Sequence, residues 1–254
     1  MNILCIGDVV GTGGCNFLRR HLPQIKKEYS VDFVVANGEN SADGNGIMPY
    51  SAEHLFASGV DVITTGNHAF KRKEAPSLFE NNSKVLRPAN LWGDIDGYGY
   101  YIADLGRARI AVINLIGTVY MNSAGNPFNV ADRLLSKIDA DYIIVDIHAE
   151  ATSEKLAMGY MLDGRVSAVW GTHTHVPTAD AQILPKGTGY ITDIGMTGPV
   201  DSCLGVRTEL SIQKMRTKLP VRFATADGPC AMDGVLFTLD NATGKCTAVK
   251  RIRV

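Results

Sequence analysis

Five short apolar runs in this chain each stop at a small cluster of polar side chains. The runs begin at residues 3, 33, 60, 142 and 166, and β-branched residues are common in them. The clusters that follow are Gly7-Asp8, Gly38-Glu39-Asn40, Gly66-Asn67-His68, His148-Ala149-Glu150 and Gly171-Thr172-His173-Thr174-His175. Short apolar runs of this kind are typical of strands that helices bury on both faces. This repeated pattern limits the possible folds more than any other feature of the sequence.

The segments between these runs are helical in character. Residues 14–29 repeat apolar side chains at helical spacing, and residues 51–58 and 153–162 predict shorter helices. Alternating strands and helices indicate an α/β fold with largely parallel central strands. Ligands of such sheets bind outside the carboxyl ends of the strands. We therefore expect all five polar clusters to lie along one edge of a sheet.

Two further segments predict antiparallel hairpins. Residues 98–115 turn at Gly106-Arg107, and residues 234–252 turn at Asn241-Ala-Thr-Gly. Hairpins late in the chain suggest a second sheet packed on the first. We find no low-complexity linker and no internal repeat, so residues 1–254 are expected to form a single domain.

Composition restricts the partners and the compartment. The formal net charge is −1, so no global attraction to a nucleic-acid polymer or an anionic membrane is expected. A small anionic substrate remains possible, because a metal cluster can supply local positive charge. No apolar stretch approaches the roughly 20 residues that cross a bilayer, and no signal peptide is apparent. Five scattered cysteines without C-x-x-C suit a reducing compartment, so the cytoplasm is expected.

The polar clusters hold the residue types that bind divalent metals. In an extended segment His173 and His175 would point to the same face, which predicts one shared site. A lone H-x-H pair is more often part of a loop, and clustered histidines and carboxylates can also form a buried hydrogen-bond network. Similar donors at equivalent strand ends favour a metal site over both: Asp8, Glu39, Asn67 and His148. Mixed nitrogen and oxygen donors without thiolate indicate Mn, Fe or Zn. Two such ions about 4 Å apart could bridge a hydroxide and polarise a phosphoryl group.

The motifs resemble those of the calcineurin-like metallophosphoesterases, and most closely those of one bacterial branch, the YmdB-like phosphodiesterases. The matching runs are Gly7-Asp8-Val9-Val10-Gly11, Ala36-Asn37-Gly38-Glu39-Asn40, Thr65-Gly66-Asn67-His68, residues 148–155 and residues 171–180. The resemblance extends over essentially the whole chain. It implies a four-layer α/β/β/α sandwich of two packed β-sheets. It also implies a metal-dependent phosphodiesterase acting on cyclic nucleotides (2′,3′ or 3′,5′) by a hydroxide that two metals activate.

The same resemblance implies a role for each matching residue. Glu39 would bridge the two metals. Asp8, Asn40 and His175 would complete the shell of one metal. Asn67, His148 and His173 would complete the shell of the other. His68 would be the catalytic histidine, close to the leaving-group oxygen.

The chain departs from the broad superfamily at two positions, and the branch shares both. Val9-Val10 follows Asp8 where D-x-H is usual, and Glu39 replaces the usual bridging aspartate. Asn40 is expected to fill the missing position. Fewer nitrogen ligands favour harder ions, so Fe(II) or Mn(II) is expected.

Several alternatives stay open at this point. The same scaffold could serve a phosphomonoesterase, a protein phosphatase or a non-enzymatic nucleotide-binding regulator. A dinucleotide-binding module is disfavoured, because Gly11-Thr12-Gly13-Gly14 does not fit G-x-G-x-x-G. Glu150 and Asp193 are candidates for groups that orient the ligands. Residues 198–230 form an excursion that caps the site, joins subunits or does neither. The resemblance also implies a homo-oligomer, either a dimer or a tetramer.

Overall fold

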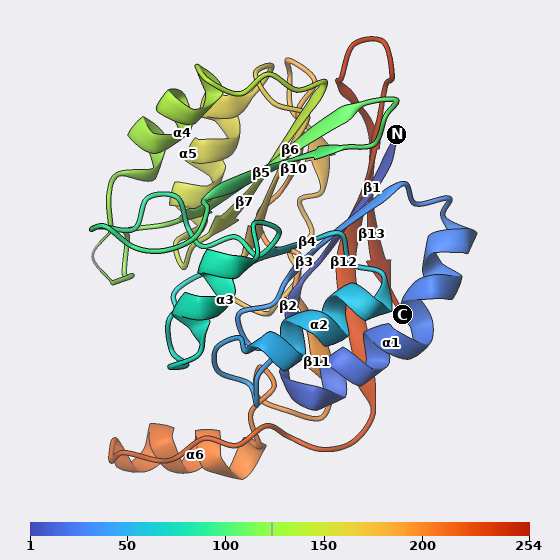
Figure 1. Cartoon of the computed structure of the whole chain (residues 1–254). Helices are drawn as coiled ribbons and strands as arrows, with labels where there is room; N and C mark the ends of the chain where they lie inside the picture. The colour runs from blue at the N-terminus through green and yellow to red at the C-terminus, as the bar shows by residue number, and fades with distance from the viewer. Residues whose placement is uncertain (123) are drawn as a thin grey trace.

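Two β-sheets pack against each other in the computed structural model, which describes residues 1–122 and 124–254 (Figure 1). The first sheet has the strand order β2-β11-β12-β1-β3-β4, with β13 beside β12. Its strands are β1 (Asn2–Ile6), β2 (Asp8–Val9), β3 (Phe33–Asn37), β4 (Val62–Thr64), β11 (Met196–Pro199), β12 (Cys230–Leu239) and β13 (Cys246–Arg253).

The second sheet has the strand order β5-β6-β7-β8-β10-β9. Its strands are β5 (Tyr100–Asp104), β6 (Arg109–Ile116), β7 (Tyr142–His148), β8 (Ala168–Thr172), β9 (Gln182–Ile183) and β10 (Gly189–Ile191). The helices of the described residues are α1 (Gly11–Glu28), α2 (Pro49–Ser58), α3 (Ala75–Asn81), α4 (Pro127–Leu135), α5 (Thr152–Leu162) and α6 (Thr208–Thr217). None of them combines the length and the apolar character that crossing a membrane requires.

The five polar clusters are divided between the two sheets. In the first sheet, β1 pairs in parallel with β3, and β3 with β4. In the second, β7 pairs in parallel with β6 and β8. The expectation that one sheet edge carries all five clusters is therefore wrong. Strand-helix alternation does not specify which strands pair, and here the chain changes sheet after β4.

Both expected hairpins are confirmed, but the later one has a different place from the one expected. β5 and β6 pair antiparallel in the second sheet. β12 and β13 also pair antiparallel, yet β12 lies beside β1 in the first sheet. The late hairpin therefore extends the first sheet and does not build the second.

Buried apolar residues form three clusters, and successive residues of β1 contribute to two of them. Ile3 and Cys5 belong to a cluster that contains Trp170 and Phe237 and lies between the sheets. Leu4 and its neighbours on the other face of the first sheet pack against α1 and α2. A third cluster joins α4 and α5 to the second sheet. The strands are therefore buried on both faces, and polar side chains collect at the strand ends.

One segment extends away from the packed sheets. Residues 200–229, which we call the arm, leave β11, form α6 and return into β12 (Figure 1). Apolar side chains of the arm are exposed, among them Ile212, Met215, Leu219 and Phe223. The expected excursion of residues 198–230 corresponds closely to this arm.

Candidate metal centre

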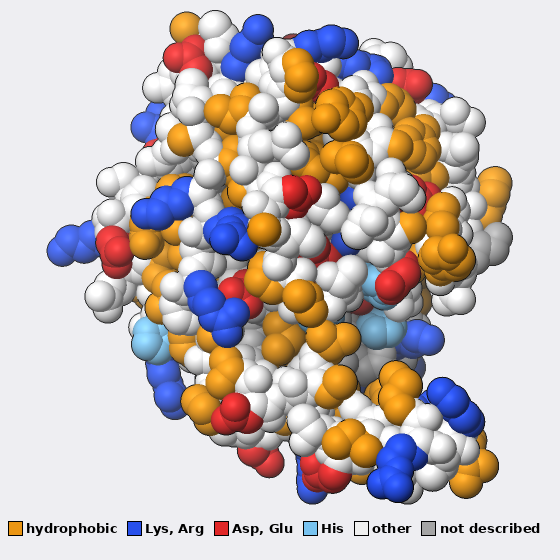
Figure 2. Space-filling view, turned by 180° about the vertical axis from the view of Figure 1, so that it is seen from behind, with side chains coloured by type: hydrophobic (Ala, Val, Ile, Leu, Met, Phe, Trp, Pro, Cys, Tyr) orange, Lys and Arg blue, Asp and Glu red, His pale blue; other side chains and the backbone are white. Residues whose placement is uncertain are grey.

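All eight residues predicted for the site meet where the carboxyl ends of the parallel strands in the two sheets face each other. The first sheet and the loops after its strands supply Asp8, Glu39, Asn40, Asn67 and His68. The second sheet and the loop after β8 supply His148, His173 and His175. Histidine side chains gather beside an acidic side chain on this face of the molecule, above the projecting arm (Figure 2). Hydrogen bonds and ion pairs connect all eight residues into one group.

One half of the site centres on the buried ring of His148. Its Nε2 lies 2.8 Å from Asn67 Oδ1, 3.2 Å from Glu39 Oε1 and 3.1 Å from His173 Nδ1. The ligand atoms of Glu39, His148 and His173 lie within 4.8 Å of one another. These four side chains thus present nitrogen and oxygen donors to one point. Gly66 leaves space for them, because a Cβ there would lie 2.1 Å from the His148 ring.

The other half of the site centres on the buried carboxylate of Asp8. His175 Nε2 lies 3.5 Å from Asp8 Oδ1, and Asn40 Nδ2 lies 3.4 Å from the same oxygen. The backbone N–H of His173 donates to Asp8 Oδ2 at 3.1 Å. Since His173 also contacts His148, the two halves adjoin each other.

The two histidines after β8 reach the site by a route that the sequence did not predict. β8 ends at Thr172, and His173 and His175 have φ angles of +101° and +64°. The extended geometry expected for this pair is therefore wrong. Positive φ is costly for residues with a Cβ and persists where surrounding contacts hold it. The strained turn directs one ring toward His148 and the other toward Asp8.

His68 lies beside the candidate ligands and is partly open to solvent. Its backbone N–H donates to Glu39 Oε2 at 2.8 Å, and its Nδ1 lies 2.8 Å from Asn40 Oδ1. With Nδ1 engaged in this way, Nε2 is the ring atom that can meet a substrate. Burial, together with the charge of His148, lowers the pKa of His68 despite the nearby Glu39 carboxylate.

The buried carboxylates carry negative charge that needs compensation. Burial alone would raise the pKa of Asp8, but His175 holds it well below its ordinary value. Burial would also raise the pKa of Glu39, but His148 holds that one low as well. No lysine or arginine of the described residues forms an ion pair with either carboxylate, and imidazoles are their partners. Divalent cations suit such a set of oxygen and imidazole donors.

Asp146 belongs to the site and was missed by sequence reasoning. This buried residue of β7 accepts hydrogen bonds from Thr172 Oγ1 at 2.8 Å and from Thr64 Oγ1 at 2.6 Å. Thr172 Oγ1 in turn lies 3.0 Å from His148 Nδ1. The chain of bonds favours a proton on Nδ1 of His148, which turns Nε2 toward the other candidate ligands. An acidic residue inside an apolar strand was the available signal.

The two residues proposed to orient the ligands differ in their contacts. Glu150 Oε2 lies 2.9 Å from His173 Nε2, so this carboxylate contacts a candidate ligand directly. Asp193 is buried and accepts from the backbone N–H of Thr174, between the two histidines. It therefore acts on the loop that carries the histidines.

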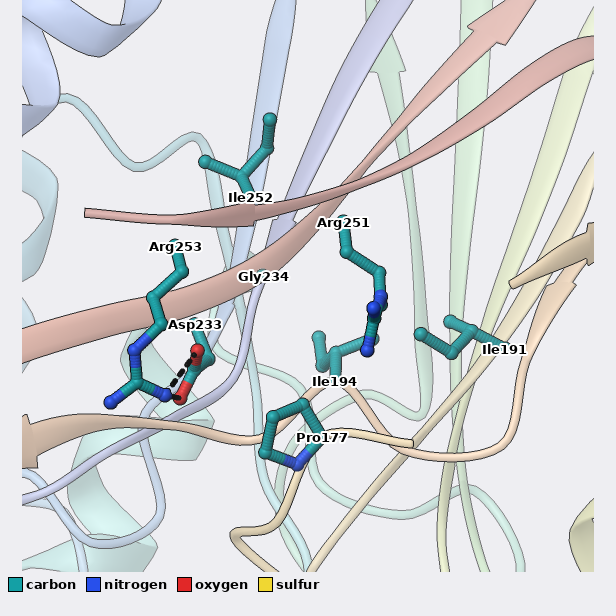
Figure 3. A pocket seen from close by; sticks show the side chains of 8 residues that line it. All are labelled: Pro177, Ile191, Ile194, Asp233, Gly234, Arg251, Ile252 and Arg253. Atoms are coloured by element: carbon teal, nitrogen blue, oxygen red, sulfur yellow. Dashed lines mark hydrogen bonds and ion pairs between the residues drawn. The ribbon is translucent and has the colours of Figure 1, made fainter. Parts of the chain in front are cut away.

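A groove formed by two adjoining cavities leads from the site toward β12 and β13. A cavity of about 180 Å³ is lined by His175, Pro177, Asp233 and Arg253, among others. It shares the last three residues with a neighbouring cavity of about 330 Å³, into which Arg251 also points (Figure 3). Arg253 Nη1 lies 3.1 Å from both carboxylate oxygens of Asp233. The groove thus joins a candidate ligand to a rim that bears two guanidinium groups.

Comparison with known proteins gives matches along the whole chain. A family model described as "YmdB-like protein" matches residues 4–252. The 2′,3′-cyclic-nucleotide 2′-phosphodiesterase of Bacillus subtilis is 44% identical, over 100% of this chain and 97% of that protein.

Two solved structures share both sequence and fold with the chain. A hypothetical protein from Thermus thermophilus is 40% identical with a TM-score of 0.95, over 100% of this chain and 99% of that one. A novel phosphatase from Mycoplasma pneumoniae is 37% identical with a TM-score of 0.94, over 100% and 93%. The likeness thus covers both sheets and every segment that supplies the site.

Proposed function

The chain belongs to the YmdB-like protein family, and from that membership we propose that it is a metal-dependent phosphodiesterase. The observation that supports this most strongly is the convergence of two buried carboxylates with three histidines and two amides at one place. Its substrate class is a small phosphodiester such as a cyclic nucleotide. The similar protein of Bacillus subtilis, a 2′,3′-cyclic-nucleotide 2′-phosphodiesterase, favours the 2′,3′ isomer.

We propose that the site holds two divalent ions, Fe(II) or Mn(II). Asn67, His148 and His173 would bind one ion, and Glu39 would be shared by both. Asp8, Asn40 and His175 would bind the other. Bound there, the ions would neutralise the phosphate and activate water as a nucleophile. Support comes from the two groups of contacts around His148 and Asp8, and from the absence of lysine and arginine partners for the carboxylates among the described residues.

The protein's own side chains would orient the substrate and handle the proton. His68 is held by Glu39 and Asn40. In its imidazolium form its Nε2–H would donate a proton to the leaving oxygen, and the neutral ring left behind would keep its hydrogen on Nδ1. The chain of bonds through Thr172 and Asp146 would keep the His148 ring fixed while charge develops. The guanidinium groups of Arg251 and Arg253 would attract an anionic substrate toward the groove.

We extend the proposal to the architecture and the setting of the protein. The three apolar clusters support a four-layer α/β/β/α sandwich, which would make residues 1–254 a single domain. All five cysteines are free, which supports a cytoplasmic location. The near-neutral charge supports neither a membrane nor a nucleic-acid polymer as partner. The exposed apolar side chains of the arm support a homo-oligomer, a dimer or a tetramer.

The test is hydrolysis by protein reconstituted with Mn(II) or Fe(II). Substrates are 2′,3′-cyclic AMP, 3′,5′-cyclic AMP and matched nitrophenyl mono- and diesters. Wild type is compared with His148→Ala and with His21→Ala, a histidine of α1 that stacks on Phe17. We expect diester turnover that His148→Ala abolishes and His21→Ala preserves. No diester turnover with two ions bound per chain would overturn the proposal.

A second candidate is a phosphomonoesterase, which the similar Mycoplasma pneumoniae phosphatase favours. The same assay separates the two, because a monoesterase would prefer the nitrophenyl monoester. A third outcome, tight nucleotide binding without turnover of any ester, would indicate a regulator.

A further inference from the structure

A buried ion pair lies behind the loop that carries the two candidate histidine ligands. Lys155 Nζ, from the first turn of α5, lies 2.7 Å from Asp193 Oδ2 in the segment after β10. The two side chains are 0% and 1% exposed. Neither belongs to the set of candidate ligands, and the proposed reaction does not use them.

The carboxylate of Asp193 also accepts hydrogen bonds from backbone N–H groups near the site. Its Oδ2 also accepts from the N–H of Thr174 at 3.1 Å, and its Oδ1 accepts from the N–H of Gly195 at 2.9 Å. Thr174 is the residue between His173 and His175. Asp193 therefore binds the strained turn at its midpoint. The residues on either side of that point, His173 and His175, have φ angles of +101° and +64°.

Backbone contacts connect the same segment to both ends of the turn. The N–H of Ile194 donates to the carbonyl of Gly171 at 3.0 Å, and the N–H of Thr178 donates to the carbonyl of Asp193 at 3.0 Å. A Cβ at Gly171 would lie 2.7 Å from Lys155 Cδ, so the lysine stem packs directly against the start of the turn. The turn is thus held before, within and after the two histidines.

Stability alone does not explain this ion pair. Removing two charges from water costs free energy that their attraction often fails to recover, so apolar replacements are frequently neutral or stabilising. A lone Asp193 carboxylate would be costly to bury, and Lys155 is the cation that pairs with it. Its two oxygens accept from Lys155, Thr174 and Gly195 at once.

We propose that Lys155 and Asp193 are positioning residues that hold His173 and His175 in the geometry that binds metal. The inference rests on the proposed function, because it assumes that these histidines are ligands. In Asp193→Asn the amide N–H₂ must face either the Lys155 ammonium or a backbone N–H, which are both donors. The variant loses the Gly195 bond if its oxygen takes the place of Oδ2, or the Lys155 and Thr174 bonds if its nitrogen does. In either orientation the buried Lys155 ammonium loses its counter-charge, so the strained turn is expected to relax.

The first test compares Asp193→Asn with Asp163→Asn in the full chain. Asp163 is also a buried carboxylate beside α5, but it accepts from the N–H of Lys186 and Thr188, away from the histidines. In chelator-treated protein we expect hydrogen exchange at the Thr174 amide to be at least about tenfold faster in Asp193→Asn only. Equilibrium dialysis should show Mn(II) affinity weakened about tenfold to a hundredfold in the same variant.

A double variant separates positioning from stability. Lys155→Met/Asp193→Asn removes both charges, so no charge remains unpaired and the fold should persist even if a single variant unfolds. We expect wild-type-like unfolding by urea together with weakened Mn(II) binding and an altered Co(II) absorption spectrum. Wild-type Mn(II) affinity and Thr174 exchange in the folded double variant would overturn the inference. If wild type itself binds neither Mn(II) nor Fe(II), the proposed function fails instead, so the two failures are distinguishable.

Discussion

At the scale of single residues, the imidazole of His148 contacts the Glu39 carboxylate on one side and Thr172 on the other, and Thr172 donates to Asp146. Burial on its own would lower the pKa of this imidazole, but the Glu39 carboxylate outweighs it and raises the pKa to about 9. At neutral pH the metal-free protein therefore carries a second proton on His148, at Nε2, whereas a metal ligand must offer a free Nε2. Binding of the proposed metal at His148 would therefore release this proton.

The coupling predicts how metal affinity depends on pH. Below a pH of about 9 the proton competes for His148, so the apparent affinity for Mn(II) should fall about tenfold for each pH unit that is lost. Titration calorimetry at pH 7.5 in two buffers of different ionisation enthalpy measures the protons released. We expect at least about one proton per chain in wild type. His68→Ala should release as many, and heats independent of the buffer would contradict the prediction.

The sequence predicted which side chains meet better than it predicted their local geometry. Donor residues at strand ends were visible because they stand directly after apolar runs in the sequence. The positive φ angles of His173 and His175 were not visible, since they depend on Asp8 and Asp193, which are distant in sequence. Asp146 was overlooked because it lies inside an apolar run.

At the scale of elements, strand identity was predictable and strand pairing was not. Each parallel strand carries its own apolar pattern, which local sequence reveals. β12 lies between β1 and β13, more than 220 residues from β1 along the chain, and no local pattern specifies that neighbour. The division of the strands into two sheets depends on such long-range pairing, so the single sheet edge that we expected was wrong.

The cluster between the sheets predicts a large effect for one phenylalanine. Phe237 of β12 is fully buried, and its ring centroid lies 6.3 Å from that of Trp170 in the second sheet. Phe237→Ala should lower the free energy of unfolding by about 3–5 kcal/mol, because a cavity would open between the sheets. Urea denaturation measures this. Phe223→Ala, in the exposed arm, should change the free energy of unfolding by less than about 0.5 kcal/mol. Equal effects of the two substitutions would contradict the assignment of Phe237 to the core between the sheets.

At the scale of the whole molecule, the arm is the feature that a lone copy of the chain does not explain. Met215 is 67% exposed and Leu219 is 64% exposed, on a segment that makes a long excursion between β11 and β12. Apolar side chains gathered in this way mark contact surfaces, and identical copies most often pair symmetrically.

The arm therefore predicts self-association that charge should weaken. Met215→Lys/Leu219→Lys should lower the molar mass that light scattering measures at a fixed protein concentration. Tyr98→Lys replaces an exposed aromatic residue outside the arm and serves as the control. A monomeric wild type, or a double variant of unchanged mass, would refute a role for the arm in assembly.

The division of the site between two sheets also bears on how the protein is made. Asp8, Glu39, Asn40 and Asn67 leave the ribosome well before His148, His173 and His175. β1, which precedes Asp8, gains its neighbour β12 only when residue 239 has been synthesised. No nascent fragment that stops short of the last hairpin holds the full ligand set on a completed sheet. Loading with the proposed metals would therefore follow translation.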